Sequence, residues 1–241
     1  MPSAVGHLRY GPSSVSVPRK GYWLVLECDR DWFHWHGSAA QRSLPPQFIC
    51  GPGDTPKMGI TRPTLCPPAW GPHISIVRGE RPKNHTPVWD LAVRAGDVRD
   101  QAVSRREAAR AIREKLVHLQ AALDNTVKPK ARQELEATIP ALLRQANGLE
   151  TDSRRTFQRD LPAAQANWRQ AATSAGVPHW LAPGVPIEFE YDPVPRTSGH
   201  HWWFMVTCEA LLDLREVYGI RRAPRVPLHL TFAVHEGVPE D

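Results

Sequence analysis

Two positions in the chain pair a histidine with a hydroxyl side chain two residues later. His73 is followed by Ser75, and His229 is followed by Thr231. Because an imidazole titrates near neutral pH, one can take a proton from water while the other, protonated, supplies a proton to a leaving oxygen. The hydroxyls can donate hydrogen bonds to phosphate oxygens and stabilise charge that grows in the transition state. This set predicts phosphoester cleavage with no metal and no cofactor, and it leaves open which histidine is the base.

A β-strand is the element that would position each pair. The histidines lie in apolar segments, residues 72–77 and 228–234. Side chains alternate between the faces of a strand, so a histidine and the hydroxyl two residues on share one face, while the intervening residues face the core. Two such strands lying side by side would bring both imidazoles and both hydroxyls into one cleft.

The settings of the two motifs match, which is the main argument for a functional pair. Residues 22–28 form an aromatic and aliphatic segment before the first motif, and residues 202–208 form one before the second. Chance supplies about one His-x-Ser/Thr tripeptide in a chain of this composition. A third case, at His36, lacks apolar flanks and is treated as coincidence. We therefore expect two similar halves that face each other.

The remaining segments suggest an α+β fold with a helical insertion. Residues 96–174 show apolar residues at helical spacing, with Gly148 as a plausible stop for the second helix. We expect a short helix near residues 31–41 and a strand at residues 88–93. Residues 1–20 are expected to form a loose arm without a signal peptide. The expected divisions are an N-terminal lobe (1–95), the helical insertion (96–175) and a C-terminal lobe (176–241).

Charge and composition limit the classes of partner. The formal net charge is +5, which favours an anionic partner such as a phosphate-bearing substrate or RNA. Between residues 94 and 160 there are about 14 positive and 10 negative side chains, typical of a solvated bundle. Nucleic-acid contact by this segment is the alternative, through Arg105, Arg106, Arg110 and Arg113. No apolar run is long enough for a membrane span, and the cysteines favour a reduced, cytoplasmic protein.

His73, Ser75, His229 and Thr231 match the doubled H-x-[S/T] motif of the 2H phosphoesterase superfamily, which includes LigT-like RNA 2′,3′-cyclic phosphodiesterases. The chain resembles that superfamily over both halves, and the long separation of the motifs marks the helices as an insertion. The resemblance implies two pseudo-symmetric antiparallel-sheet lobes and a hydrolase. Its substrates would be 2′,3′-cyclic phosphates, 2′,5′-linked oligonucleotides or, as in phage anti-CBASS members, cyclic oligonucleotide signals. The insertion could cap the cleft, bind RNA or form a homo-oligomer.

Five further residues are candidates for binding the substrate. Trp70 and Tyr22 could stack on a base, with Trp70 favoured because it lies in a Pro/Gly loop. Arg78 and Arg225 could attract phosphate, and His201 could line the mouth of the cleft. A zinc site is not expected, because adjacent histidines on a strand point to opposite faces and no third ligand is suitably spaced. The competing interpretation is a non-catalytic RNA- or nucleotide-binding module acting through the helical insertion.

Overall fold

The computed structural model describes residues 1–12, 21–43, 47–48, 60–61, 65–68, 70–126, 128–198 and 200–235. The chain divides into two compact units. Met1–Val93 and Ala172–Asp241 together form the first unit, and Arg94–Ala171 form the second. The two ends of the sequence therefore fold together, and the helical segment between them is a unit of its own.

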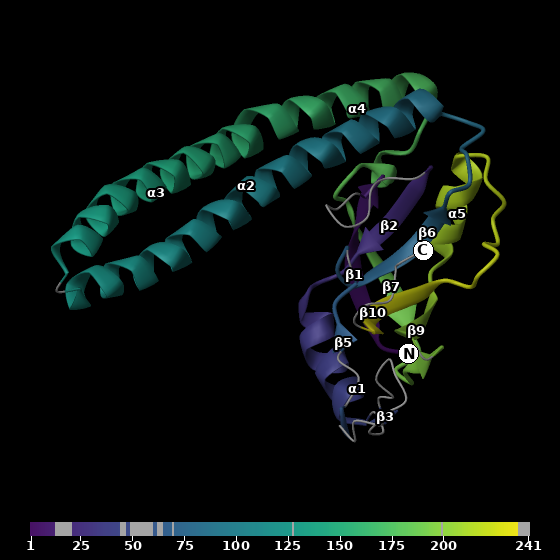
Figure 1. Cartoon of the computed structure of the whole chain (residues 1–241). Helices are drawn as coiled ribbons and strands as arrows, with labels where there is room; N and C mark the ends of the chain where they lie inside the picture. Colours follow the sequence, from purple (N-terminus) through teal and green to yellow (C-terminus); the bar gives the residue numbers. More distant parts are fainter. Residues whose placement is uncertain are drawn as a thin grey trace. The chain divides into compact units, whose positions relative to one another are not determined.

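An antiparallel sheet is the framework of the first unit (Figure 1). Its strand order is β5-β10-β6-β2-β1-β7-β9-β8, and β10 also pairs with β9. This extra pairing closes β10, β6, β2, β1, β7 and β9 into a barrel-like ring. The strands are β1 (Ser3–Tyr10), β2 (Trp23–Glu27), β5 (Leu65–Cys66), β6 (His73–Arg78), β7 (Pro186–Tyr191), β8 (Arg196–Thr197), β9 (His201–Thr207) and β10 (His229–His235). A separate pair joins β3 (Gln47–Phe48) to β4 (Ile60–Thr61).

The strand order repeats between the two halves of the chain. Starting from β6, the neighbours are β2 and then β1; starting from β10, they are β9 and then β7. The two histidine strands, β6 and β10, pair directly with each other. The expected mixed α and β class, with antiparallel strands and a long helical insertion, is confirmed. The halves share one closed sheet, whereas the sequence suggested a sheet for each lobe.

Alternation explains which face of each histidine strand meets the core. On β6, Ile74 and Ile76 are buried, and on β10 Leu230 and Phe232 are buried. The residues between them, which carry the imidazoles and hydroxyls, therefore face the opposite side. The short helix α5 (Glu209–Val217) packs against β6 and buries Leu211 and Leu214.

The expectation of a loose N-terminal arm is wrong for the described residues, because residues 3–10 form β1. This strand pairs with β2 on one side and β7 on the other. A Cβ added at Gly6 would lie 2.6 Å from the side chain of Leu26, so glycine allows the close approach of the two strands. The Tyr10 hydroxyl donates to the carbonyl of Leu181 over 2.7 Å. The Ser-, Pro- and Gly-rich composition concealed these tertiary contacts.

The expected strand at residues 88–93 is also wrong, because the segment belongs to a helix. Helix α2 spans Thr86–Asn125. Its buried residues Val88, Trp89 and Ala92 fit a helical face. A short apolar run cannot be assigned to helix or strand from its periodicity alone. The predicted helix near residues 31–41 is present, as η1 (Phe33–Gly37) followed by α1 (Ser38–Ser43).

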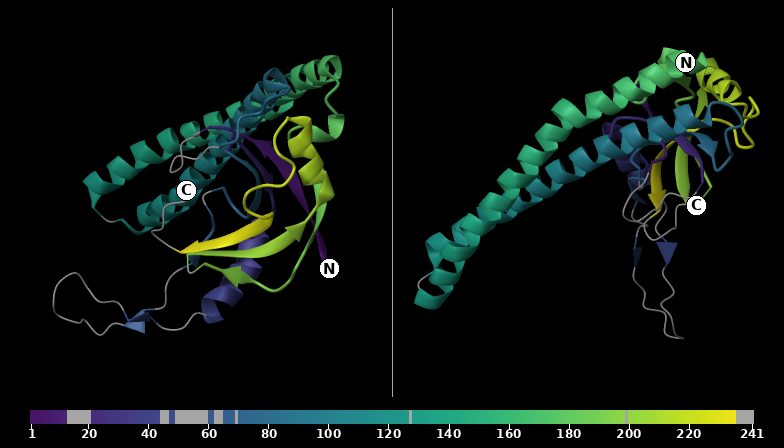
Figure 2. Two further views of the ribbon diagram at one scale, coloured as in Figure 1. Left: turned by 90° about the vertical axis from the view of Figure 1, so that its right-hand side faces the viewer. Right: turned by 90° about the horizontal axis from the view of Figure 1, so that it is seen from above.

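Helices make up the second unit, in which a returning helical segment lies beside α2 (Figures 1 and 2). The segment comprises α3 (Pro129–Arg155), the π-helical turn η2 (Thr156–Asp160) and α4 (Leu161–Ala175); the one-turn η3 (His179–Leu181) belongs to the first unit. Gly148 does not end the second helix as expected, because a single glycine weakens a helix without terminating it. Arg113 contacts Glu150 at 2.6 Å across the pair of helices.

None of the described helices is both long enough and apolar enough to cross a bilayer. Even α2, which spans Thr86–Asn125, carries charged residues along its length.

Candidate active site

The pairing of β6 with β10 brings the two predicted motifs together. Thr231 lies opposite His73, and continuing this antiparallel register places His229 opposite Ser75. Directly opposed residues have Cβ atoms about 4.5–5.5 Å apart. All four side chains line one cleft. The structure therefore gathers both imidazoles and both hydroxyls on one face of two neighbouring strands.

The cleft has the size and lining of a small-molecule site. Its volume is about 510 Å³, within the range of roughly 300–1,000 Å³ typical of ligand pockets. The lining combines indoles and aliphatic side chains with cationic and titratable groups, and the described part of it includes no Asp or Glu. Besides the four motif residues, the lining consists of Trp23, Trp70, Arg78, Arg196, Ser198, His201, Trp203, Met205, Val226, Pro227 and Val234.

Both catalytic candidates are anchored in the same way. His73 Nδ1 lies 2.8 Å from the carbonyl oxygen of Gly71, and His229 Nδ1 lies 2.8 Å from that of Pro227. Because a carbonyl only accepts, Nδ1 carries the hydrogen in each ring and Nε2 is the nitrogen left for proton transfer. Gly71 has φ +74°, a conformation that favours glycine. Each histidine is thus oriented by the carbonyl two residues before it.

Burial keeps both imidazoles neutral. It lowers the pKa of His73 to about 4, against the opposing effect of the hydrogen bond to Gly71, and the positive charge of Arg78 lowers it further. The pKa of His229 is also lowered, first by burial and then by Arg78. Arg78 Nη2 lies 3.1 Å from His229 Nε2. Both rings are therefore expected to be neutral at pH 7.

The depressed pKa of His73 makes stability depend on pH. The unfolded chain takes up a proton on this side chain near pH 6.5, whereas the folded protein resists protonation down to about pH 4. The free energy of unfolding is therefore expected to fall as the pH drops from 6.5 to 4, by roughly 3 kcal/mol from this group. Urea denaturation at several pH values should show a shallower fall for His73→Gln. Equal pH dependence in both proteins would contradict the assignment.

Three of the five predicted substrate-binding residues lie in the cleft. Trp70 lies beside His73, with ring centroids 5.5 Å apart, and its indole Nε1 is buried without a hydrogen-bond partner among the described residues. Arg78 and His201 also line the cleft. Trp70 is packed edge-on against Trp23, at a centroid distance of 5.1 Å. The aromatic wall on this side of the cleft is thus a pair of indoles.

Two predicted residues are not part of the cleft lining. The ring of Tyr22 packs against Trp89 of α2, at a centroid distance of 6.0 Å. The next residue along the strand, Trp23, faces the cleft instead, because alternation reverses the side at each step. Arg225 is exposed on the loop before β10 and does not line the cleft. Tyr22 was proposed for its place on the strand before the first motif and Arg225 for its place in the basic loop before the second, and neither criterion decides which side a residue faces.

Sequence reasoning missed Trp203, which lies on the other side of the cleft. Its ring centroid is 5.7 Å from that of His229. Each catalytic candidate therefore has an indole beside it, Trp70 in one half and Trp203 in the other. A signal was present, because His201, Trp203 and Met205 alternate along β9 and share a face.

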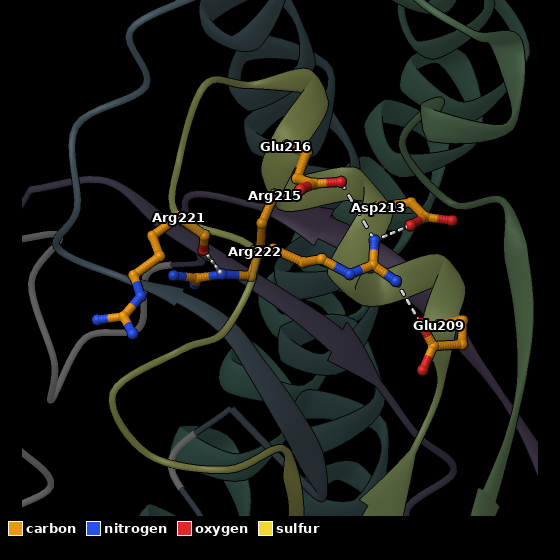
Figure 3. Close-up of polar contacts among 6 residues, drawn as sticks. All are labelled: Glu209, Asp213, Arg215, Glu216, Arg221 and Arg222. Atoms are coloured by element: carbon orange, nitrogen blue, oxygen red, sulfur yellow. Dashed lines mark hydrogen bonds and ion pairs between the residues drawn. The ribbon is translucent and has the colours of Figure 1, made fainter.

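A buried arginine on α5 fixes the end of β6, where Arg78 lies. Arg215 is 1% exposed and donates to the carbonyl of Ile76 and, over 2.7 Å, to Glu80 Oε1. Glu80 Oε2 in turn accepts from the backbone N–H of Arg78 at 2.7 Å. Figure 3 shows Arg215 beside Arg221, whose carbonyl accepts from Arg215 Nε at 2.8 Å. The buried guanidinium thereby supports the strand that carries His73 and Arg78.

Among the described residues, no group of three or more His, Cys, Asp or Glu is arranged to hold a metal ion. His200, the other member of the adjacent histidine pair, is exposed and does not line the cleft with His201.

The geometry of the cleft is the guide to its chemistry. Its four central side chains come from two paired strands. In both histidines, the ring nitrogens have defined hydrogen-bond roles. No protein-family model, curated protein or solved structure matches this chain, so similarity to known proteins does not identify its family.

Proposed function

We propose that the chain is a 2H-type phosphodiesterase, a hydrolase in which two histidines share general acid–base catalysis. The observation that carries the proposal is the pair of Nδ1-anchored imidazoles on adjacent strands, each accompanied by a hydroxyl in one cleft. Such an arrangement offers a proton acceptor and a proton donor at the same phosphate. Structural histidines alone do not account for the repeated anchoring.

The reaction balances with these groups. Nε2 of one histidine takes a proton from water as the water oxygen bonds to phosphorus. The bond between phosphorus and the leaving oxygen breaks, and that oxygen receives the proton held on Nε2 of the other histidine. Ser75 and Thr231 donate hydrogen bonds to the non-bridging phosphate oxygens, whose charge grows in the transition state.

The lining of the cleft favours a nucleotide-like substrate. Trp70 and Trp203 offer aromatic surface next to the imidazoles, and a base stacked on an aromatic side chain contributes about 1–3 kcal/mol to binding. The cationic Arg78 and Arg196 favour a phosphate. Together with the resemblance to 2H phosphoesterases, these features favour a cyclic or 2′-linked phosphodiester in a nucleotide, a cyclic oligonucleotide signal or an RNA end.

A substrate panel tests the proposal. It contains nucleoside 2′,3′-cyclic phosphates, 2′,5′-linked dinucleotides, cyclic dinucleotides and trinucleotides, and RNA ending in a cyclic phosphate, each assayed with EDTA present. We expect hydrolysis of at least one class, followed by chromatography of the products. Hydrolysis of none would contradict the function, and activity lost on adding EDTA would indicate metal-dependent chemistry instead.

Charge supports a second candidate, a non-catalytic RNA-binding module. The unit Arg94–Ala171 contains 15 Lys and Arg against 10 Asp and Glu, so its net charge of +5 equals that of the whole chain. Several of its arginines are paired with carboxylates, among them Arg113 with Glu150 and Arg132 with Glu136, which weakens this candidate. Salt-dependent RNA binding without cleavage of any panel substrate would favour it over the hydrolase.

A further inference from the structure

Arg78 donates a hydrogen bond to Nε2 of His229, the ring nitrogen that this residue would need for catalysis. Its Nη2 lies 3.1 Å from His229 Nε2, while Nδ1 of the same ring is bonded to the carbonyl of Pro227. The guanidinium can only donate, so Nε2 must accept with its lone pair, and the ring must be neutral. A protonated Nε2 would point an N–H at another N–H. With Arg78 bound to Nε2, His229 therefore has no proton to give to a leaving oxygen.

We propose that Arg78 is an anion-operated gate: a phosphate group entering the cleft takes the guanidinium from His229, and the freed Nε2 then takes up a proton from solvent, which makes His229 the general acid. His73, which has no such partner described at Nε2, is then the general base. This inference rests on the proposed phosphodiesterase function and assigns the two histidines their separate roles.

Phosphate is the stronger partner for a guanidinium. Arginine binds phosphate through two parallel, charge-assisted hydrogen bonds, whereas a neutral imidazole offers it a single acceptor. Arg78 is the last residue of β6, and its backbone N–H stays bonded to Glu80. Its side chain can therefore exchange partners without displacing the strand.

The charges around His229 explain why its protonation depends on the binding of an anionic substrate. Besides burial, the groups that lower its pKa are Arg78 on β6 and His201 on β9. Arg196 on β8 and His73 on the paired strand also line the cleft, and the described lining residues include no carboxylate, although Asp192 pairs with Arg196. Arg78 and His201 therefore oppose an imidazolium at this position until an anion enters. A bound phosphate both neutralises Arg78 and attracts the new proton.

His73 is unprotonated, as a general base must be before the reaction. It is 7% exposed, and burial is the main cause that lowers its pKa, which keeps Nε2 free of a proton although it also weakens its basicity. The structure describes no guanidinium bond to its Nε2, which remains available as an acceptor. A phosphate bonded to Arg78 would leave this ring neutral and able to take a proton from the attacking water.

The gate is tested by following the pKa of His229 by NMR of the histidine side chains, with assignment from His229→Ala. Sulfate serves as the probe because it stays dianionic through the titration, and chloride at equal ionic strength is the reference. We expect sulfate to raise the pKa of His229 by about one unit. In Arg78→Gln, the pKa should already be raised without sulfate, and the response to sulfate should be lost.

Two further variants make the result specific. Arg196→Gln removes an equal charge from the same cleft, but Arg196 pairs with Asp192 rather than with His229; it should keep most of the sulfate response. Arg78→Lys, which retains the charge, should keep part of it and guards against misfolding of the glutamine variant.

The outcomes of these measurements separate the gate from the catalytic function. Equal pKa values in sulfate and chloride would overturn the gate, as would a wild-type response in Arg78→Gln. Panel substrates cleaved without a sulfate response would reject the gate alone. A sulfate response with no substrate cleaved would reject the phosphodiesterase function.

Discussion

Replacing either His73 or His229 with alanine is expected to lower kcat by about 10²–10⁴-fold, the usual contribution of a general acid or base. The reason is that each ring supplies a different proton transfer, so neither can substitute for the other. The measurement is turnover of the best panel substrate, with circular dichroism to verify folding. Glutamine variants should behave similarly, since an amide fills the space but does not titrate.

His200 provides a matched control for these substitutions. It is exposed and precedes the cleft residue His201 directly, but it does not line the cleft. His200→Ala should therefore keep nearly full activity. If His73→Ala or His229→Ala retained wild-type turnover while folding normally, the two-histidine mechanism would be rejected.

Replacing the buried Arg215 with alanine is expected to cause the largest loss of stability, about 3 kcal/mol. The substitution leaves the carbonyl of Ile76 and one carboxylate oxygen of Glu80 without their donor. The carbonyl of Ile76 would be left buried without its donor, which costs free energy, whereas Glu80 is 33% exposed and can be solvated in part. Urea denaturation measures the change. Activity should fall as well, since Glu80 also holds the backbone of Arg78.

Arg222 is the matched control for this second substitution. It is a neighbouring arginine that contacts Glu209, Asp213 and Glu216 on the outer side of α5 (Figure 3). Exposed ion pairs contribute little to stability, so Arg222→Ala should unfold at nearly the wild-type urea concentration. Similar effects of the two substitutions would show that burial of Arg215 does not govern its importance.

The central pair of strands could be predicted from sequence because local and long-range signals agreed. Alternation placed each histidine and its hydroxyl on one face, and the matching segments at 22–28 and 202–208 implied neighbouring strands. The observed pairs β2–β6 and β9–β10, joined through β6–β10, follow that expectation. Trp70 and Arg78 were identified from their position beside the first motif, and His201 from its position before the aromatic segment at residues 202–208.

Other features could not be predicted because they depend on contacts between distant parts of the chain. Tyr22 was predicted to bind the substrate, but the next residue, Trp23, lines the cleft instead. An error of one position reverses the face, because side chains alternate along a strand. A charged residue on an amphipathic helix is usually assigned to the solvent. Arg215 is buried only because Ile76 and Glu80, far away in sequence, accept its hydrogen bonds. The hydrogen-bond partner of His229 Nε2 could likewise be identified only from the three-dimensional structure.

The most direct test of the shared active site is a double-mutant cycle of kcat/KM on the best panel substrate, using wild type, His73→Ala, His229→Ala and the double variant. If the two histidines act on one phosphate in one step, the double variant should be about as inactive as either single variant, because groups that work as a unit are strongly non-additive. Losses that multiply independently, or a double variant that keeps wild-type activity, would contradict the account.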